Sequence, residues 1–227
     1  MKYTEFEKII SQPRMSRYLT ACNGDTKNAM TLYRLNLRLS QELFTLISCF
    51  EISLRDAIDS HYSQQFGHNW LKDAVSPNGV FNNQPCRKTA YIISTGIQKL
   101  QLNYTHPKLL AEMDFGFWRY LFAQPQFHAA GHSLLRIFPA KPKSSSSMQY
   151  NNTYVFNELE KINFIRNRIA HHEPICFKSR QSVIDTTYTK QHYRLILDLF
   201  NWLQINEREL LYGLDHVNSI VNKIDTL

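Results

Sequence analysis

The residues best suited to chemistry in this sequence stand in one short stretch, from Arg166 to Pro174. It reads Arg-Asn-Arg-Ile-Ala-His-His-Glu-Pro and contains two arginines and two adjacent histidines. Histidine changes its charge near neutral pH and can act as a general acid or base. Arginine can bind a phosphate through two parallel hydrogen bonds and offset negative charge that develops in a transition state. The stretch therefore favours acid–base chemistry on a bound phosphate group.

A helix is expected to position these side chains. Apolar residues recur at helical spacing over residues 154–172, and one face carries Val155, Leu159, Ile162, Ile165 and Ile169. Pro174 disfavours helical geometry at Glu173, so the helix should stop there. The negative end of the helix dipole then favours protonated histidines, which suits a group that donates a proton to a leaving oxygen.

Helical geometry also relates the candidate residues to one another. Asn167 and His171 are four residues apart and should share a face, as should Arg168 and His172. Arg166 and His171 lie about 140° apart on an ideal helix. The long Arg166 side chain can still reach toward His171 if the last turn loosens.

The spacing of Arg166 and His171 does not identify a site by itself. Arg55 and His61 show a similar Arg-to-His spacing, and a histidine at a helix end often only caps it. His128 and His132 have a spacing that can hold a metal on a helix, but no third ligand stands nearby. No metal and no cofactor are therefore expected.

Composition limits the class of protein. The net charge of +7 over 227 residues favours a polyanionic partner such as RNA or DNA, although solvated surface lysines also produce such a charge. The four cysteines are widely spaced, which is typical of free thiols in a reducing compartment. The N-terminal residues form no signal peptide, and no stretch approaches the roughly 20 apolar residues that a membrane span needs. We expect a cytoplasmic protein that does not contact membranes.

Helical periodicity throughout predicts an all-α protein, with no strand alternation and no internal repeat. The first clear helix begins at Asp25 or Thr26, either of which can cap it, and runs to about Tyr62 before Gly67. Its length leaves room for a bend or break near Ser48. Further helices are expected at residues 88–101, from Pro107 to just before Pro125, at 186–211, and after Gly213. Residues 1–227 should form a single domain, with a flexible loop at about 139–152.

Four segments resemble the Abi-like (abortive infection, AbiD/AbiF-type) proteins of bacteria, within the HEPN superfamily. The segment Arg166-Asn167-Arg168-Ile169-Ala170-His171-His172 is similar to the family's R-N-x-x-A-H-H pattern. Upstream, residues 15–19 and 29–36 resemble its "R-x-Y-L … A-x-x-L-Y-x-x-N" opening, residues 50–58 its "E-x-x-L-R-N" helix, and residues 115–122 its "G-F-W-x-x-L-F" segment. These landmarks occur in the family's order over residues 15–175.

The resemblance implies a HEPN-type helical bundle with additional helices, and a homodimer in which the Arg–His motifs of two chains meet. It also implies a metal-independent endoribonuclease that acts in phage defence or as a toxin, with RNA as partner and a possible antitoxin protein. Arg166 and His171 match the catalytic positions, with Asn167, His172, Glu51 and Arg55 in support. Asp56 departs from the family's usual Asn.

The mechanism implied is transesterification. A base removes the proton of a ribose 2′-OH, the oxygen attacks the adjacent phosphate, and an acid protonates the departing 5′-oxygen. The products carry a 2′,3′-cyclic phosphate and a free 5′-OH.

Two other functions stay open. A catalytically silent HEPN module could bind RNA or a protein partner as a sensor or scaffold. A DNA-binding regulator ranks last, because the sequence shows no helix-turn-helix with its short glycine turn. Glu51 could equally form an ordinary surface ion pair with Arg55, and Trp118 and Phe117 suit the core better than base stacking.

Overall fold

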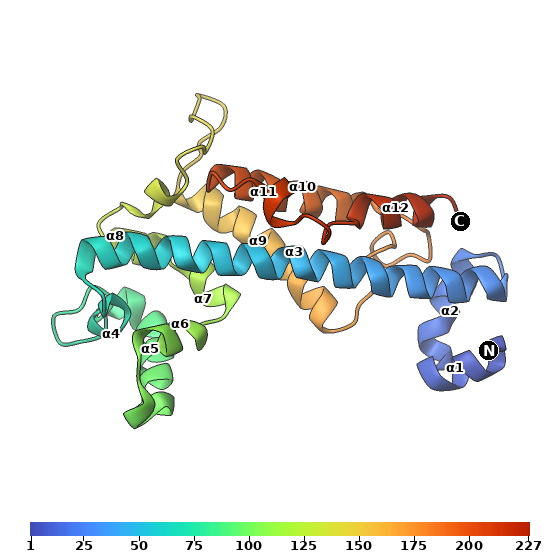
Figure 1. Cartoon of the computed structure of the whole chain (residues 1–227), viewed down its shortest axis with the longest axis horizontal. Helices are drawn as coiled ribbons and strands as arrows, with labels where there is room; N and C mark the ends of the chain where they lie inside the picture. The colour runs from blue at the N-terminus through green and yellow to red at the C-terminus, as the bar shows by residue number, and fades with distance from the viewer. The chain divides into compact units, whose positions relative to one another are not determined.

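The computed structural model describes residues 1–227 and consists of α-helices joined by turns and loops (Figure 1). The only β feature is an isolated bridge between Phe177 and Ile184, so the predicted all-α class is confirmed. The helices are α1 (Tyr3–Ile10), α2 (Gln12–Ala21), α3 (Thr26–Phe66), α4 (Trp70–Asp73), α5 (Arg87–Leu100), α6 (His106–Ala111), α7 (Phe115–Tyr120), α8 (Gln124–Ala129), α9 (Asn152–Ala170), α10 (Thr187–Trp202), α11 (Glu207–Leu210) and α12 (Val217–Asp225). No helix combines the length and the apolar character that crossing a bilayer requires.

The chain divides into two compact units. The first comprises Met1–Ser48, Phe164–Leu197 and Glu207–Leu227, and the second comprises Cys49–Asn163 and Asp198–Asn206. Helices α3, α9 and α10 each contribute residues to both units. The single domain expected over residues 1–227 stays a prediction.

Helix α3 begins where the sequence predicted. The Asp25 carboxylate accepts hydrogen bonds from the backbone N–H groups of Lys27 and Asn28, both at 2.9 Å, and so caps the helix. The helix continues without a break through Ser48, whose hydroxyl donates to the Phe44 carbonyl oxygen at 2.8 Å. Most of its apolar residues from Ala29 to Tyr62 are buried along one stripe, whereas Leu37, Phe44 and Ile52 are exposed. The continuous buried stripe favours one long helix.

Two helices precede α3, in a region where the sequence showed no clear element. Helices α1 and α2 are short, and each buries only one or two side chains. Aromatic contacts attach them to α3: the Phe6 ring lies 5.5 Å from the ring of Tyr33, and the Tyr18 ring lies 5.2 Å from the same ring. In Figure 1 both helices stand beside the start of α3.

The prediction of a single helix between Pro107 and Pro125 is wrong, because α6 and α7 are separate helices. Asp114 interrupts it, because its carboxylate accepts a hydrogen bond from the Phe117 backbone N–H at 2.8 Å and so caps α7. The indole N–H of Trp118 donates to the Met113 carbonyl oxygen, so this backbone acceptor has a partner although the helix is interrupted there. Side-chain capping at this point outweighs the helical periodicity on either side.

The helix expected over 186–211 is also interrupted. Helix α10 ends at Trp202, Gln204 adopts a φ of 59°, and the Ile205 backbone N–H returns to the Phe200 carbonyl oxygen at 3.0 Å. The helix expected after Gly213 is confirmed as α12, whose buried face contains Val217, Ile220, Val221 and Ile224.

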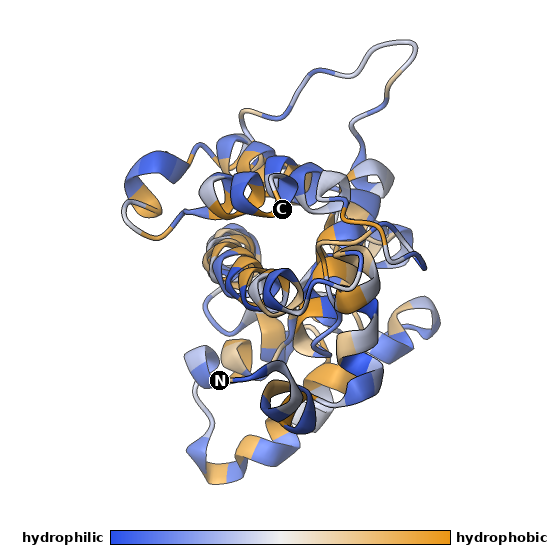
Figure 2. Cartoon of the chain, turned by 90° about the vertical axis from the view of Figure 1, so that its right-hand side faces the viewer, coloured by the Kyte–Doolittle hydropathy of each residue, from blue (hydrophilic) through white to orange (hydrophobic).

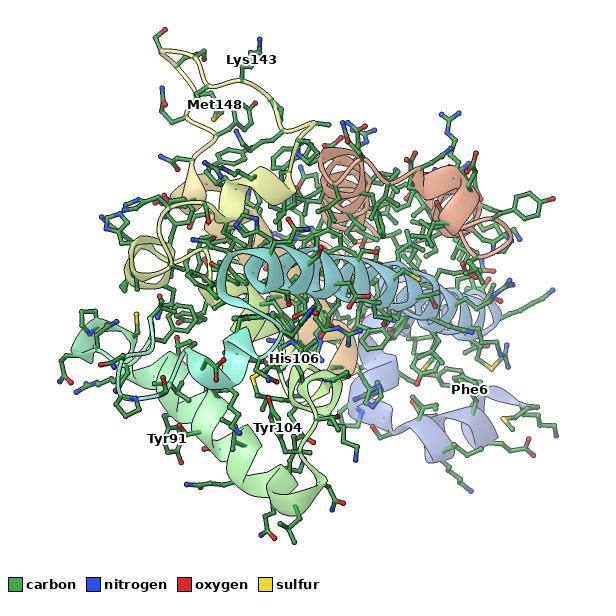
Figure 3. All side chains as sticks on the ribbon, turned by 60° about the vertical axis from the view of Figure 1, so that its left-hand side comes forward. Phe6, Tyr91, Tyr104, His106, Lys143 and Met148 are labelled. Atoms are coloured by element: carbon green, nitrogen blue, oxygen red, sulfur yellow. The ribbon has the colours of Figure 1, made fainter.

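Residues 139–151 form no helix or strand, as predicted. Most of its residues are hydrophilic or intermediate in hydropathy, as the blue and white colours of Figure 2 show, and Figure 3 labels Lys143 and Met148 along it.

Elsewhere in the second unit, helices α4 to α7 lie beside the later part of α3 (Figure 1). There the imidazole of His106, labelled in Figure 3, and the indole of Trp70 both contact the Asp59 carboxylate at 2.7 Å.

Candidate functional site

The C-terminal end of α9 carries the predicted site and closes in a defined turn. The Glu173 backbone N–H donates to the Arg168 carbonyl oxygen at 2.8 Å, and that of His172 to the Ile169 carbonyl oxygen at 2.9 Å. Together with the φ of +56° at His172, this pair of bonds is a Schellman motif. The helix therefore ends at Ala170, two residues earlier than predicted, and both histidines stand beyond it.

This turn changes the relation between Arg166 and His171. The backbone N–H of His171 still donates to the Asn167 carbonyl oxygen at 2.9 Å, but its side chain is exposed. The half-buried Arg166 side chain reaches the Asn167 amide oxygen at 3.5 Å, and its buried Nε–H has no hydrogen-bond partner. The two residues thus share one helix end, and no hydrogen bond joins their side chains.

Arg168 has a structural role in the same turn. Its guanidinium donates to the Pro174 carbonyl oxygen at 2.7 Å and to the Glu173 carboxylate at 3.2 Å, and it lies 4.9 Å from the centroid of the Tyr188 ring. These contacts hold the chain as it leaves the helix. Arg168 therefore does not pair with His172, with which it was expected to share a face.

The chain beyond the histidines is anchored from two helices. The Ile175 backbone N–H donates to the buried Asn36 side-chain oxygen of α3 at 2.9 Å. The Thr189 hydroxyl of α10 donates to the Ile175 carbonyl oxygen at 2.6 Å. Both backbone polar groups of the buried residue Ile175 are thereby satisfied, and the position of the His171–Pro174 turn is set.

A cavity of about 420 Å³ lies between this turn and helices α2 and α3, all within the first unit. His171 and His172 form part of its wall, together with Arg14 and Arg17 of α2. Arg166 is not among the lining residues. The cavity thus combines two imidazoles and two guanidinium groups with one carboxylate, that of Glu173, which is paired with Arg168. The cationic groups outnumber the carboxylate, which suits an anion.

The two arginines of the cavity differ in how firmly they are held. Arg17 donates to the carbonyl oxygens of Gln181 and Lys178 at 2.6 and 3.0 Å, and it lies 4.5 Å from the centroid of the Phe177 ring. Arg14 is exposed, and it donates to the His172 carbonyl oxygen at 3.4 Å, near the limit for a hydrogen bond. Arg14 is therefore the cation with more freedom to contact a ligand.

A family model described as Abi-like protein matches residues 2–176. The chain belongs to the Abi-like protein family. No curated protein and no solved structure matches it. The matched span of this Abi-like protein includes α2, the whole of α3 and the turn that carries both histidines.

Glu51 and Arg55, the supporting residues from the earlier helix, lie on the part of α3 that belongs to the second unit. Arg55 forms an ion pair with Asp56 at 3.0 Å. Asp56 is the residue that departs from the family's Asn, so its carboxylate gives Arg55 a partner that an amide would bind less strongly. A role for Glu51 or Arg55 beside Arg166 stays a prediction.

Other groups of this Abi-like protein fit structural roles. Burial raises the pKa of Cys176 to about 12, which keeps its thiol neutral near the turn. Burial also raises the pKa of Tyr18, a cavity-lining phenol. The rings of His128 and His132 lie 4.3 Å apart, and no group of three or more His, Cys, Asp or Glu residues could hold a metal ion.

Arg14 and Arg17 were not identified as site residues from the sequence. Arg17 lies in the segment 15–19 that resembles the family's opening, although the R of R-x-Y-L falls at Ser16. No sequence signal marked Arg14, because its position beside His172 depends on a hydrogen bond between residues 158 apart in the sequence.

Proposed function

We propose that this Abi-like protein is a metal-independent endoribonuclease of the HEPN type, of the AbiD/AbiF kind, that acts in the cytoplasm in phage defence or as a toxin. The observation that carries the proposal is an exposed imidazole, His171, in the wall of a cavity that also contains Arg14, Arg17 and His172. Cations and imidazoles of this kind match the needs of an RNA phosphodiester undergoing proton transfer.

In the proposed reaction, one His171 imidazole removes the proton of a ribose 2′-OH. The 2′-oxygen forms a bond to the adjacent phosphorus while the bond from phosphorus to the 5′-oxygen breaks. A second proton-transfer group delivers a proton to that 5′-oxygen, which leaves as a hydroxyl, and a 2′,3′-cyclic phosphate remains. Arg166 stabilises the additional negative charge, and Asn167 and His172 support the site.

One chain offers a single His171, whereas the reaction needs a base and an acid. A two-fold homodimer supplies both, because each chain contributes the same residues to a shared site. The protein partners we propose are therefore a second copy of this chain and, in a toxin role, an antitoxin protein.

Purified protein incubated with RNA and EDTA tests the proposal. Fragments with 2′,3′-cyclic phosphate ends should accumulate, and His171→Ala and Arg166→Ala should each slow cleavage by about 100-fold or more. The matched controls are His68→Ala and Arg208→Ala, which remove exposed side chains of the same types. Cleavage abolished by EDTA, or retained by His171→Ala, contradicts the proposal.

A silent RNA-binding module is the second candidate. It is favoured by one observation: the cavity contains His171 but not Arg166, so the proposed catalytic pair is not assembled in the cavity of one chain. Expression in a bacterial host separates the two functions. Growth arrest relieved by Arg166→Ala indicates the nuclease, whereas RNA binding without cleavage or arrest indicates the silent module.

A further inference from the structure

A second cavity, of about 400 Å³, lies in the second unit between the start of α5, helix α7 and the start of α8. None of its lining residues takes part in the proposed RNA site. Four rings form much of its wall: those of Pro85, Phe117, Tyr120 and Pro125. Its volume is within the range of small-molecule sites, and walls of proline and aromatic rings fit a flat molecule.

Gly116 helps to keep this space open. It lines the cavity from within α7, and a Cβ built there would lie 3.2 Å from the Asp114 carboxylate oxygen that caps the helix. A side chain at this position would therefore crowd the Asp114 cap at the cavity wall.

One wall residue has an unsatisfied polar atom. The Gln126 side chain is 4% exposed and donates to the Thr89 hydroxyl at 2.9 Å, in a buried hydrogen bond. Its amide oxygen is buried and has no hydrogen-bond partner. A buried acceptor without a partner is costly, and this oxygen is closed to solvent in the structure. A ligand donor would therefore gain a hydrogen bond there when the Gln126 side chain turns toward the cavity.

The charged groups of the cavity indicate a neutral ligand. Lys88 and Asp114 both line it and have opposite signs. The Lys88 ammonium lies 5.6 Å from the centroid of the Tyr120 ring, which partly satisfies it, and the Asp114 carboxylate caps α7. The two formal charges in the wall cancel, so the cavity has no net charge that would select a charged ligand.

We propose that this cavity binds a neutral, flat heteroaromatic molecule that bears an N–H donor, of the size of a nucleobase or nucleoside, with the donor bound to the Gln126 amide oxygen. The ring stacks among the proline and aromatic side chains. Binding at this site is independent of RNA cleavage, so the proposal does not depend on the nuclease activity.

Paired probes test the donor requirement. Indole and benzofuran have the same ring shape, but only indole has an N–H group. Titrated into the full chain and followed by amide NMR signals of Gly116, Phe117 and Gln126, indole should bind about 10-fold more tightly than benzofuran. Adenosine and uridine, titrated in the same way, establish whether a nucleoside fits.

Two variants and one control assign the site. Gln126→Leu should abolish the preference for indole, and Ala123→Leu, which adds bulk to the cavity wall, should weaken both probes about 10-fold or more. Gln124→Leu, an exposed change on the same helix, should alter neither affinity. Equal affinity of the wild type for the two probes, shifts outside the cavity only, or a preference kept by Gln126→Leu would overturn the proposal. If Gln126→Leu fails to fold, the Ala123→Leu comparison and the wild-type probe pair still decide it.

Discussion

His172 adopts a backbone conformation that residues with a side chain adopt only at a cost. Its φ is +56°, in the left-handed region, and it occupies the position of the Schellman motif where glycine is most common. Histidine tolerates this region better than β-branched residues, but glycine does so without steric penalty. The chain keeps a histidine at this position in the wall of the first cavity.

We expect His172→Gly to raise the free energy of unfolding by about 0.5–1 kcal/mol, because it relieves this strain. Urea denaturation measures the change. His68→Gly is the matched control: His68 has no positive φ, so glycine there should lower stability. A loss of stability in His172→Gly would show that the imidazole stabilises the turn more than the backbone strain weakens it.

His61 should make stability depend on pH. Burial lowers its pKa below the usual 6.5, and the charge of Arg136 lowers it further. Below pH 6.5 the unfolded state then binds a proton more readily than the folded state, so this residue's contribution to stability falls as the pH drops through that value.

The free energy of unfolding of the wild type should therefore decrease more between pH 7.5 and pH 5 than that of His61→Gln. Glutamine keeps a hydrogen-bonding group near Ser133, to which His61 is linked at 2.8 Å, but it does not titrate. Urea denaturation at several pH values checks this. Identical pH profiles for the two proteins would refute the assignment.

At the scale of elements, Asn36 connects a sequence landmark to the site. It is the Asn of the A-x-x-L-Y-x-x-N pattern, it is 4% exposed, and it accepts the Ile175 backbone N–H. Its side chain therefore binds the chain just past the histidine turn to α3. This hydrogen bond gives the landmark residue a structural role, and Asn36 also lines the cavity beside the turn.

Asn36→Leu should lower the free energy of unfolding by about 1–3 kcal/mol, because it leaves the buried Ile175 N–H without an acceptor. Thermal or urea unfolding measures this, with Asn201→Leu at an exposed position as control. The same variant should also slow RNA cleavage, because the turn that carries His171 loses its hydrogen bond to α3. Stability unchanged from the wild type would mean that the hydrogen bond is replaced by another partner.

The break between α6 and α7 depends on one cap. Asp114→Ala should cost about 1 kcal/mol of stability, because the Phe117 N–H loses its acceptor, whereas Asp114→Asn should cost much less. Unfolding curves of the two variants distinguish them. Equal losses would indicate that the charge of Asp114 matters and the cap does not.

At the scale of the whole molecule, the charge of +7 supports the proposed RNA partner. RNA affinity should fall steeply with salt, because each neutralised phosphate releases counterions. Arg14→Ala should reduce the slope of log K against log salt concentration by about 0.7, the value for one contact with a single strand. Fluorescence anisotropy with labelled RNA measures the slope, and Arg208→Ala should leave it unchanged. A slope that Arg14→Ala does not alter would place the RNA elsewhere.

The sequence by itself determined the class of fold, the start of α3 near Asp25 or Thr26, the loop after residue 138 and the helix that carries Arg166. These features depend on contacts between residues near one another in the chain: periodic apolar side chains, caps, and the exclusion of helix by proline. The four landmarks likewise placed the chain in its family before any tertiary contact was known.

Only the tertiary structure decided which groups surround the histidines and where the helix end lies. The anchor of Ile175 joins residues 139 positions apart, and the contact of Arg14 with the turn joins residues 158 apart. The Gln126 cavity likewise brings together the start of α5 and two later helices. Local patterns of sequence do not encode such distances, because the energy of these contacts is gained only when distant segments pack and exclude water.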